Sequence, residues 1–270
     1  MDLLSLVILI LYTICSLLLL LYGLNTYWIV ILFLRKRGSH ELSDAETEER
    51  FTDTFDQREA LPVVTTQIPL FNEFNVAERV MRAVAAIDYP SARHEIQVLD
   101  DSNDETCARV DEVAAQLRSE GHWVTVFRRK DRIGYKAGAL EAGMKVCQGA
   151  YIAIFDSDFI PPKDFLRRTL PHLWADSNCA LVQARWDHLN AEASWLTRAQ
   201  AMGIDGHFVV EQTARNRNTL FMNFCGTAGI WRRAAIEDAG GWQHDTVTED
   251  LDLSYRAQLK GWGFHYLPSL

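Results

Sequence analysis

The first 34 residues constrain the fold of this chain more than any other feature, because they are apolar over a length that can cross a bilayer. The 32 residues from Leu3 to Leu34 carry no charged side chain. At about 1.5 Å per residue, a helix of that length would reach roughly 48 Å, beyond the ~30 Å hydrocarbon core of a membrane. We expect residues 1–34 to form a tilted transmembrane anchor, or a span that continues into the interface at Tyr27 and Trp28.

A cleaved signal peptide is the alternative for this stretch. Such a peptide begins with positive charge and has a small-residue cleavage site after an apolar core of about 7–15 residues. The sequence shows neither feature. Arg35, Lys36 and Arg37 follow the span directly, and basic flanks stay on the cytoplasmic side. We therefore expect a chain anchored in membrane lipid with its remaining residues in the cytosol.

The charged residues lie almost entirely after this span. Of 27 basic and 36 acidic side chains, with a net charge of −9, only Asp2 falls within the first 34 residues. An acidic body does not suit nucleic acid, whose phosphates need a basic surface. The five cysteines include no Cys-x-x-Cys pair, so we expect neither a disulfide framework nor a zinc site.

A charged segment separates the span from the rest of the chain. Residues 35–62 hold 13 charged side chains and few aliphatic ones. This composition is typical of a solvated linker or a short surface helix. We assign residues 35–61 to such a linker and residues 62–270 to one folded domain.

The domain alternates strand-like and helical segments, which predicts an α/β fold with a mostly parallel sheet covered by helices on both faces. Ligands of such sheets bind at the carboxyl ends of the strands. The strand candidates are Val63–Ile68, Glu95–Leu99, Trp123–Phe127, Tyr151–Phe155, Ala180–Ala184 and Phe264–Leu267. The helix candidates are Val76–Ile87, residues 105–118, Lys136–Val146, Lys163–Trp174, one long stretch Trp195–Asn216, and Leu251–Leu259.

Acidic clusters stand at three of these expected strand ends and helix starts. Asp156 and Asp158 share one short turn after a buried strand, and paired carboxylates of this kind suit Mg²⁺ or Mn²⁺. A polar turn that closes the strand is the alternative. Asp100 and Asp101 follow a second strand and could be turn and cap residues. Asp250 begins a helix, where the dipole favours acids, and is also a candidate general base.

The run Ile154–Asp158 also resembles the motif of haloacid-dehalogenase-like phosphatases, in which two aspartates follow an apolar strand. That family expects Thr or Val at the position of Ile160 and places the motif at the start of its core domain. Here the motif lies midway along the body, so we do not favour a phosphatase.

Seven segments in order resemble the processive family 2 glycosyltransferases, closest to the cellulose-synthase-like glucan and mannan synthases. The resemblance covers residues 61–270, and each segment alone is a modest signal. The segments are Ile68–Glu73, Leu99–Ser102, Gly134–Leu140, Phe155–Asp158, Val182–Trp186, Asn223–Gly229 and Thr248–Leu253.

The resemblance implies a GT-A fold and inverting transfer of a hexose from UDP-glucose or GDP-mannose to a growing β-1,4-linked polysaccharide, with Mg²⁺ or Mn²⁺ as cofactor. By the family's pattern Asp250 matches the base, and Asp156 and Asp158 match the metal motif. The residues that would contact the nucleotide sugar are Pro69, Glu73, Asp100, Asp101, Lys136, Asp156, Gly226, Thr227 and Glu249.

The chain departs from the family pattern after the base. The family has a Gln-x-x-Arg-Trp motif there, followed by further membrane helices. Gln183-Ala184-Arg185-Trp186 is one residue too short and precedes Asp250, so it does not replace that motif. We expect the domain to be C-terminally incomplete relative to the family. Two other functions stay open: a lipid acceptor, as in ceramide glucosyltransferases, and a non-catalytic membrane protein that binds nucleotide sugar.

Overall fold

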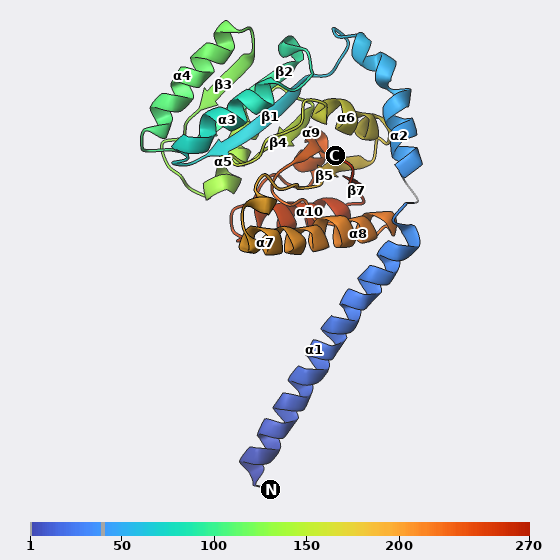
Figure 1. Cartoon of the computed structure of the whole chain (residues 1–270). Coiled ribbons are helices and arrows are strands. Elements are labelled where there is room, and N and C mark those ends of the chain that lie inside the picture. The colour runs from blue at the N-terminus through green and yellow to red at the C-terminus, as the bar shows by residue number, and fades with distance from the viewer. Residues whose placement is uncertain (1, 39–40) are drawn as a thin grey trace. The chain divides into compact units, whose positions relative to one another are not determined.

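The computed structural model of the chain describes residues 2–38 and 41–270 (Figure 1). The chain divides into two compact units, which are described separately. The first comprises Met1–His40 and His188–Leu220, and the second comprises Glu41–Asp187 and Phe221–Leu270.

The first unit contains α1 (Leu3–Lys36), the one helix of the described residues that is long and apolar enough to cross a membrane. Asp2 caps its start by accepting a hydrogen bond from Ser5 N at 2.8 Å. The predicted helix Trp195–Asn216 is confirmed as a continuous helical stretch, but its middle turn is π-helical. Its parts are α7 (Trp195–Asp205), the π-helix η4 (Gly206–Gln212) and α8 (Thr213–Arg217), preceded by the 3₁₀ turn η3 (Ala191–Ala193).

The second unit is built on a seven-stranded sheet with the order β3-β2-β1-β4-β6-β5-β7. All its neighbouring strands are parallel except where β6 pairs with β4 and β5. The expectation of a mostly parallel sheet is therefore confirmed, and the reversed β6 is the strand that the sequence did not predict. The strands are β1 (Val64–Leu70), β2 (His94–Asp100), β3 (Trp123–Phe127), β4 (Tyr151–Ile154), β5 (Cys179–Ala184), β6 (Gly229–Arg232) and β7 (Gly263–Leu267).

Helices cover both faces of this sheet (Figure 1). Each face has its own apolar core. Strand β4 shows why: Ala153 belongs to one core while Ile152 and Ile154 belong to the other, since successive side chains of a strand point to opposite faces. One face carries α3 (Phe74–Ala85), α4 (Thr106–Ser119) and α6 (Phe165–Ala175). The other carries α5 (Tyr135–Met144), α9 (Arg233–Asp238) and α10 (Glu249–Leu259).

The charged segment before the sheet is helical and is partly buried. It forms α2 (Glu41–Arg50), which packs on α6, and the short 3₁₀ helix η1 (Thr52–Asp56). Phe55 is buried with its ring centroid 5.2 Å from that of Trp174, and Asp44 of α2 is also buried. The expected surface helix is present, but these two buried side chains were not expected in a solvated linker. A second 3₁₀ turn, η2 (Ser91–Arg93), precedes β2.

Candidate nucleotide-sugar site

A cleft of about 410 Å³ opens at the carboxyl ends of β1, β2 and β4, beside the first turn of α5. This is the edge at which parallel sheets bind ligands. Its walls combine apolar side chains with both signs of charge. The lining residues are Pro69, Leu70, Phe71, Glu73, Val76, Leu99, Asp101, Arg132, Lys136, Ala139, Asp156, Ser157 and Asp158.

Pro69 and Glu73 enter the cleft from the end of β1. Pro69 pairs with Leu99 of β2 but lies beyond Gln67, the last residue of β1 that pairs with β4. A proline, which has no N–H to donate, is therefore tolerated in this central strand. The loop that follows is fixed by Asn72, whose side-chain amide exchanges hydrogen bonds of 2.9 and 3.0 Å with Asn103.

The two aspartates after β2 have arginine partners. The side chain of Asp100 is fully buried, and its Oδ2 accepts a 2.8 Å hydrogen bond from Arg128. Asp101 forms an ion pair with Arg129, whose Nε lies 3.0 Å from Oδ1. Asp101 lines the cleft, whereas Asp100 is not among its lining residues.

Lys136 joins the strand ends to a distant loop. Its Nζ donates to Asp156 Oδ1 at 2.5 Å and to the carbonyl oxygen of Gly226 at 2.9 Å. Lys136 stands in the first turn of α5, where free backbone N–H groups and the helix dipole favour an anion. One ammonium group thus positions a cleft carboxylate and the loop that contains Gly226.

Gly226 lies between this lysine and the candidate base. Its φ is +79°, and a Cβ at this position would lie 3.2 Å from Asp250 Oδ2 and 3.3 Å from Lys136 Nζ. Both the left-handed backbone and the close approach require glycine here. The loop is anchored on its other side by Gln183 of β5, whose side-chain nitrogen donates to Thr227 O at 3.0 Å. The Asp156 N–H donates to Thr227 Oγ1 at 2.9 Å.

Negative charge accumulates around these contacts. Burial raises the pKa of Asp156; Lys136 acts in the opposite direction, and the charges of Asp158 and Asp250 add to the rise. Burial likewise raises the pKa of Glu249, and the nearby charges of Asp250 and Asp156 contribute. Burial is thus the main cause of both raised pKa values, and the neighbouring carboxylates add to it against the opposing charge of Lys136.

The predicted site residues fall into two groups. Those that line the cleft are Pro69, Glu73, Asp101, Lys136, Asp156 and Asp158. The second group consists of Gly226, Thr227, Glu249 and Asp250, which are joined to the first by hydrogen bonds, close approach or charge. Asp100 is the predicted residue whose side chain lies buried beneath the edge.

Sequence reasoning missed Arg132 in the cleft, and it included Phe71 only as part of the segment Ile68–Glu73. The Arg132 guanidinium carbon lies 3.4 Å from the centroid of the Phe71 ring and 5.0 Å from that of Tyr135. The available signal was the basic run of residues 128–132 directly after β3, at the same sheet edge. Gly138 of α5 makes this loop possible, since a Cβ there would lie 2.1 Å from Ile133 O.

Asp156 and Asp158 fit a divalent cation in their chemistry. Both offer hard carboxylate oxygens from one turn after β4, and the pKa of Asp156 is raised first by burial and further by the charges of Asp158 and Asp250. Two protein carboxylates leave coordination positions for water and phosphate oxygens, as Mg²⁺ sites require.

Comparison with known proteins is consistent with this architecture. Residues 62–270 match the family described as Glycosyltransferase like family 2. The chain is 49% identical over 213 residues to glucomannan 4-beta-mannosyltransferase 2 of Arabidopsis thaliana, covering 77% of this chain and 40% of that protein. It is 48% identical over 212 residues to glucomannan 4-beta-mannosyltransferase 1 of Oryza sativa subsp. japonica, covering 77% and 41%. The chain thus spans about two fifths of the length of these relatives.

Solved structures share the fold at low sequence identity. The mannosyltransferase PcManGT from Pyrobaculum calidifontis, in complex with GDP-Man and Mn²⁺, aligns with a TM-score of 0.63 at 20% identity over 90% of this chain and 66% of that one. S. aureus TarS 1–349 in complex with UDP-GlcNAc aligns with a TM-score of 0.58 at 15% identity over 77% and 56%. The fold is accordingly of the GT-A type. With the family match over residues 62–270, this chain belongs to the glycosyltransferase-like family 2.

Proposed function

We propose that this chain is a metal-dependent, inverting glycosyltransferase that transfers a hexose from a nucleotide sugar to a β-1,4-linked polysaccharide at a membrane. The observation that carries this proposal is the contact set of Lys136. Its ammonium group contacts Asp156 and the Gly226 carbonyl, and Gly226 in turn lies against Asp250. The proposed leaving-group site and the proposed base would thus belong to one continuous set of contacts.

The cleft side of this set suits a nucleoside diphosphate. Lys136 and the N-terminus of α5 would bind the phosphates. Asp156 and Asp158 would hold Mg²⁺ or Mn²⁺, which supplies positive charge where the leaving diphosphate becomes more negative. Pro69, Glu73 and Asp101 would border the nucleoside, together with Arg132.

Asp250 would accept the proton of the acceptor hydroxyl. It stands in the first turn of α10, and its Oδ2 would lie 3.2 Å from a Cβ placed at Gly226. A base that acts on a hydroxyl opposite the leaving group produces inversion at the anomeric carbon. Gly226 and Thr227, with Glu249 nearby, would border the sugar between donor and acceptor.

GDP-mannose is the donor that we favour. The curated relatives at 49% and 48% identity are named glucomannan 4-beta-mannosyltransferases, and the neighbour PcManGT is described with GDP-Man and Mn²⁺. UDP-glucose is the second candidate. We propose further that α1 crosses the membrane with its basic end in the cytosol, because Arg35 and Lys36 form its last turn.

Two other functions make different predictions in the same assay. A lipid glucosyltransferase would transfer to ceramide-type acceptors, and a binding protein would hold the donor without transfer. The four carboxylates, which repel one another without a ligand, favour an enzyme because only catalysis needs Asp250 close to the donor site.

The experiment is donor binding followed by transfer with the detergent-solubilised chain. GDP-mannose and UDP-glucose are titrated with and without Mn²⁺, and transfer is measured on β-1,4-mannan oligosaccharides and on ceramide. Asp250→Asn should keep donor affinity within about twofold and lower transfer by at least about 100-fold, since it removes the base. Asp245→Asn, an exposed acid before the same helix, is the matched control. Unchanged transfer by Asp250→Asn would refute the base assignment.

A further inference from the structure

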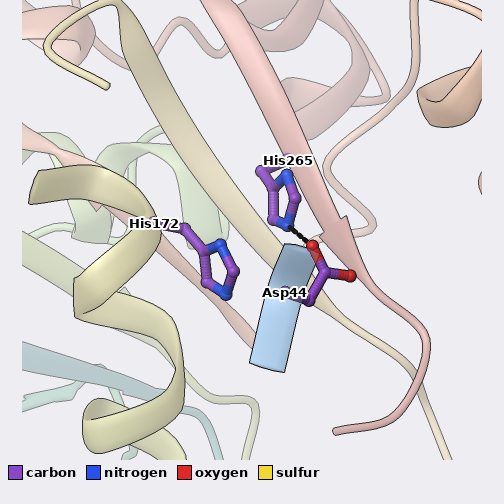
Figure 2. A group of neighbouring side chains, drawn as sticks. All are labelled: Asp44, His172 and His265. Carbon is purple, nitrogen blue, oxygen red and sulfur yellow. Dashed lines mark ion pairs between the residues drawn. The ribbon is translucent and has the colours of Figure 1, made fainter. Parts of the chain in front are cut away.

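Two histidines and an aspartate form a cluster in which Asp44 and His172 are buried and His265 is partly exposed (Figure 2). Asp44 comes from α2, His172 from α6 and His265 from β7. Their ligand atoms all lie within 4.8 Å of one another. The three residues are far apart in the sequence, and none of them is among the residues that line the cleft.

The cluster places two imidazole nitrogens beside one carboxylate. His265 Nε2 lies 3.1 Å from Asp44 Oδ1, and the His172 and His265 rings stack with centroids 4.3 Å apart and an angle of 16° between their planes. Each ring carries a nitrogen of the kind that binds metal ions in proteins.

His172 has a buried nitrogen that the rest of the described chain does not satisfy. Its side chain is 6% exposed, and Nε2 has no hydrogen-bond partner among the described residues. The nearest recorded carboxylate oxygen, Glu48 Oε1, lies 3.9 Å away, too far for a hydrogen bond. Buried polar atoms without partners are rare and indicate an unfilled role, such as binding an ion.

We propose that Asp44, His172 and His265 bind Zn²⁺. Ligand atoms of a tetrahedral zinc site are roughly 3.4 Å apart, given Zn–N and Zn–O distances of about 2.0–2.2 Å. Because each imidazole lone pair lies in its ring plane and the two rings are stacked, the rings must rotate apart before both nitrogens face one ion. Two imidazoles and one carboxylate select zinc over Mg²⁺ and Mn²⁺, which prefer oxygen ligands.

Glu48 lies beside this site, with its Oε1 3.9 Å from His172 Nε2. Its Oε2 accepts a 3.2 Å hydrogen bond from Arg168, and Arg168 also donates to Ser269 Oγ at 2.8 Å and Ser269 O at 3.0 Å. The carboxylate is thus held at the edge of the cluster, where it completes the coordination or orients a bound water. Zinc here ties α2 to α6 and β7, and so fixes the charged helix to the sheet.

The sequence predicted no zinc site because it contains no Cys-x-x-Cys pair. The ligands proposed here are separated by 128 and 93 positions, and only the packing of α2 on α6 brings them together. Ligands so far apart in the sequence follow no motif of fixed spacing, so the sequence alone does not predict such a site.

The test measures zinc content and thermal stability of the full chain in detergent. The protein is stripped with a chelator, loaded with Zn²⁺ in excess Mg²⁺, dialysed and analysed for metal. The variants are Asp44→Asn, His265→Gln and His172→Gln, so that the result does not depend on the folding of one variant. Glu49→Gln, an exposed acid on the same helix, is the matched control.

We expect the wild type and Glu49→Gln to retain one more zinc per chain than the three cluster variants. Loss of one ligand should weaken zinc affinity by at least about 100-fold. Zinc at about 100 times its dissociation constant should raise the Tm of the wild type by about 5–10 °C and leave that of the variants unchanged. Equal zinc content in wild type and cluster variants, or no zinc-dependent rise in Tm, would overturn the proposal. Neither measurement depends on glycosyl transfer.

Discussion

Two pairs of aspartates look alike in the sequence, since each follows a buried strand, but the structure surrounds them differently. Asp100 and Asp101 after β2 have one arginine each, Arg128 and Arg129. Asp156 and Asp158 after β4 lie near Lys136, which pairs with Asp156, and in the described part of the chain Asp158 forms no ion pair. The first pair is neutralised by the protein itself, whereas the second retains negative charge for a ligand.

The pKa values separate the pairs in the same way. Burial and the neighbouring charges of Asp158 and Asp250 raise the pKa of Asp156, against the effect of Lys136. A site that keeps unneutralised carboxylates lowers the stability of the empty fold, and binding a cation recovers that free energy. Both pairs consist of aspartates at the end of a strand. What distinguishes a ligand site from a supporting ion pair is whether basic side chains of the protein already pair with the carboxylates.

The largest expected effect comes from removing the exposed member of the unneutralised pair. Asp158→Ala should weaken Mn²⁺-dependent donor binding by at least about 100-fold, because it removes one proposed cation ligand. Calorimetric titration of donor with and without Mn²⁺ measures this. Asp111→Ala, which removes an exposed partner of Arg128, should leave the affinity unchanged. Equal losses in the two variants would contradict a special role for Asp158.

Substitution in the pair Asp100 and Asp101 should lower the thermal stability of the protein instead of its donor affinity. Asp100→Asn leaves Arg128 without its buried partner and weakens the contact with Ser102 N, which donates to Asp100 Oδ1 at 3.1 Å. Hydrogen bonds to charged groups contribute about 1.5–3 kcal/mol, so we expect the Tm to fall by about 5–10 °C. Donor affinity of the folded protein, measured well below the Tm, should stay within about threefold. A large loss of affinity with an unchanged Tm would reverse the assignment of the two pairs.

The lysine of the second pair sets the pH range of binding. Lys136 lowers the pKa of Asp156, so Lys136→Met should raise that pKa further. Since cation binding needs the ionised carboxylate, metal-dependent donor binding is lost as the pH falls through the pKa of Asp156. The variant should lose binding at a higher pH than the wild type and bind about 10-fold more weakly at neutral pH. A pH profile that does not move would separate Lys136 from the ionisation of Asp156.

We expect the smallest change in Tm from substituting Glu249, and the pH dependence of that change tests its cause. Burial and the charges of Asp250 and Asp156 raise its pKa, so its ionised form costs stability above that pKa and nothing well below it. Glu249→Gln should raise the Tm of the metal-free protein at neutral pH by at most about 2 °C. The gain should disappear as the pH falls and the wild-type carboxyl becomes protonated. A gain that persists in acid would point to packing instead of charge.

Most elements of the sheet could be predicted because their signals are local. Trp123–Phe127 has the predicted bounds of β3, and the ends of β1 and β2 differ from those of the expected strands by only one or two residues. β6 was missed because it has only four residues, and its reversed direction depends on pairing with β4 and β5, which no local pattern encodes.

The site was predictable to the same degree. Asp156 and Asp101 were expected at strand ends and Lys136 at the start of a helix, and all three line one cleft. The sequence could not distinguish Asp100 from Asp101, because alternate pleat directions bury one and expose the other to the cleft. Arg132 was missed because its place over the Phe71 ring depends on how the loop after β3 folds back on α5.

By itself, the sequence determined the apolar helix α1, the alternation of strands and helices, and the acidic residues at the strand ends. These follow from hydrophobic periodicity and turn chemistry, which act between near neighbours along the chain. Only the tertiary structure decided which carboxylates pair with basic side chains. It also places Gly226 between Lys136 and Asp250. Finally, it brings Asp44 close to His172 and His265. Charge and coordination depend on distances of a few ångströms between segments remote in the chain, and those distances exist only after the sheet and its helices have packed.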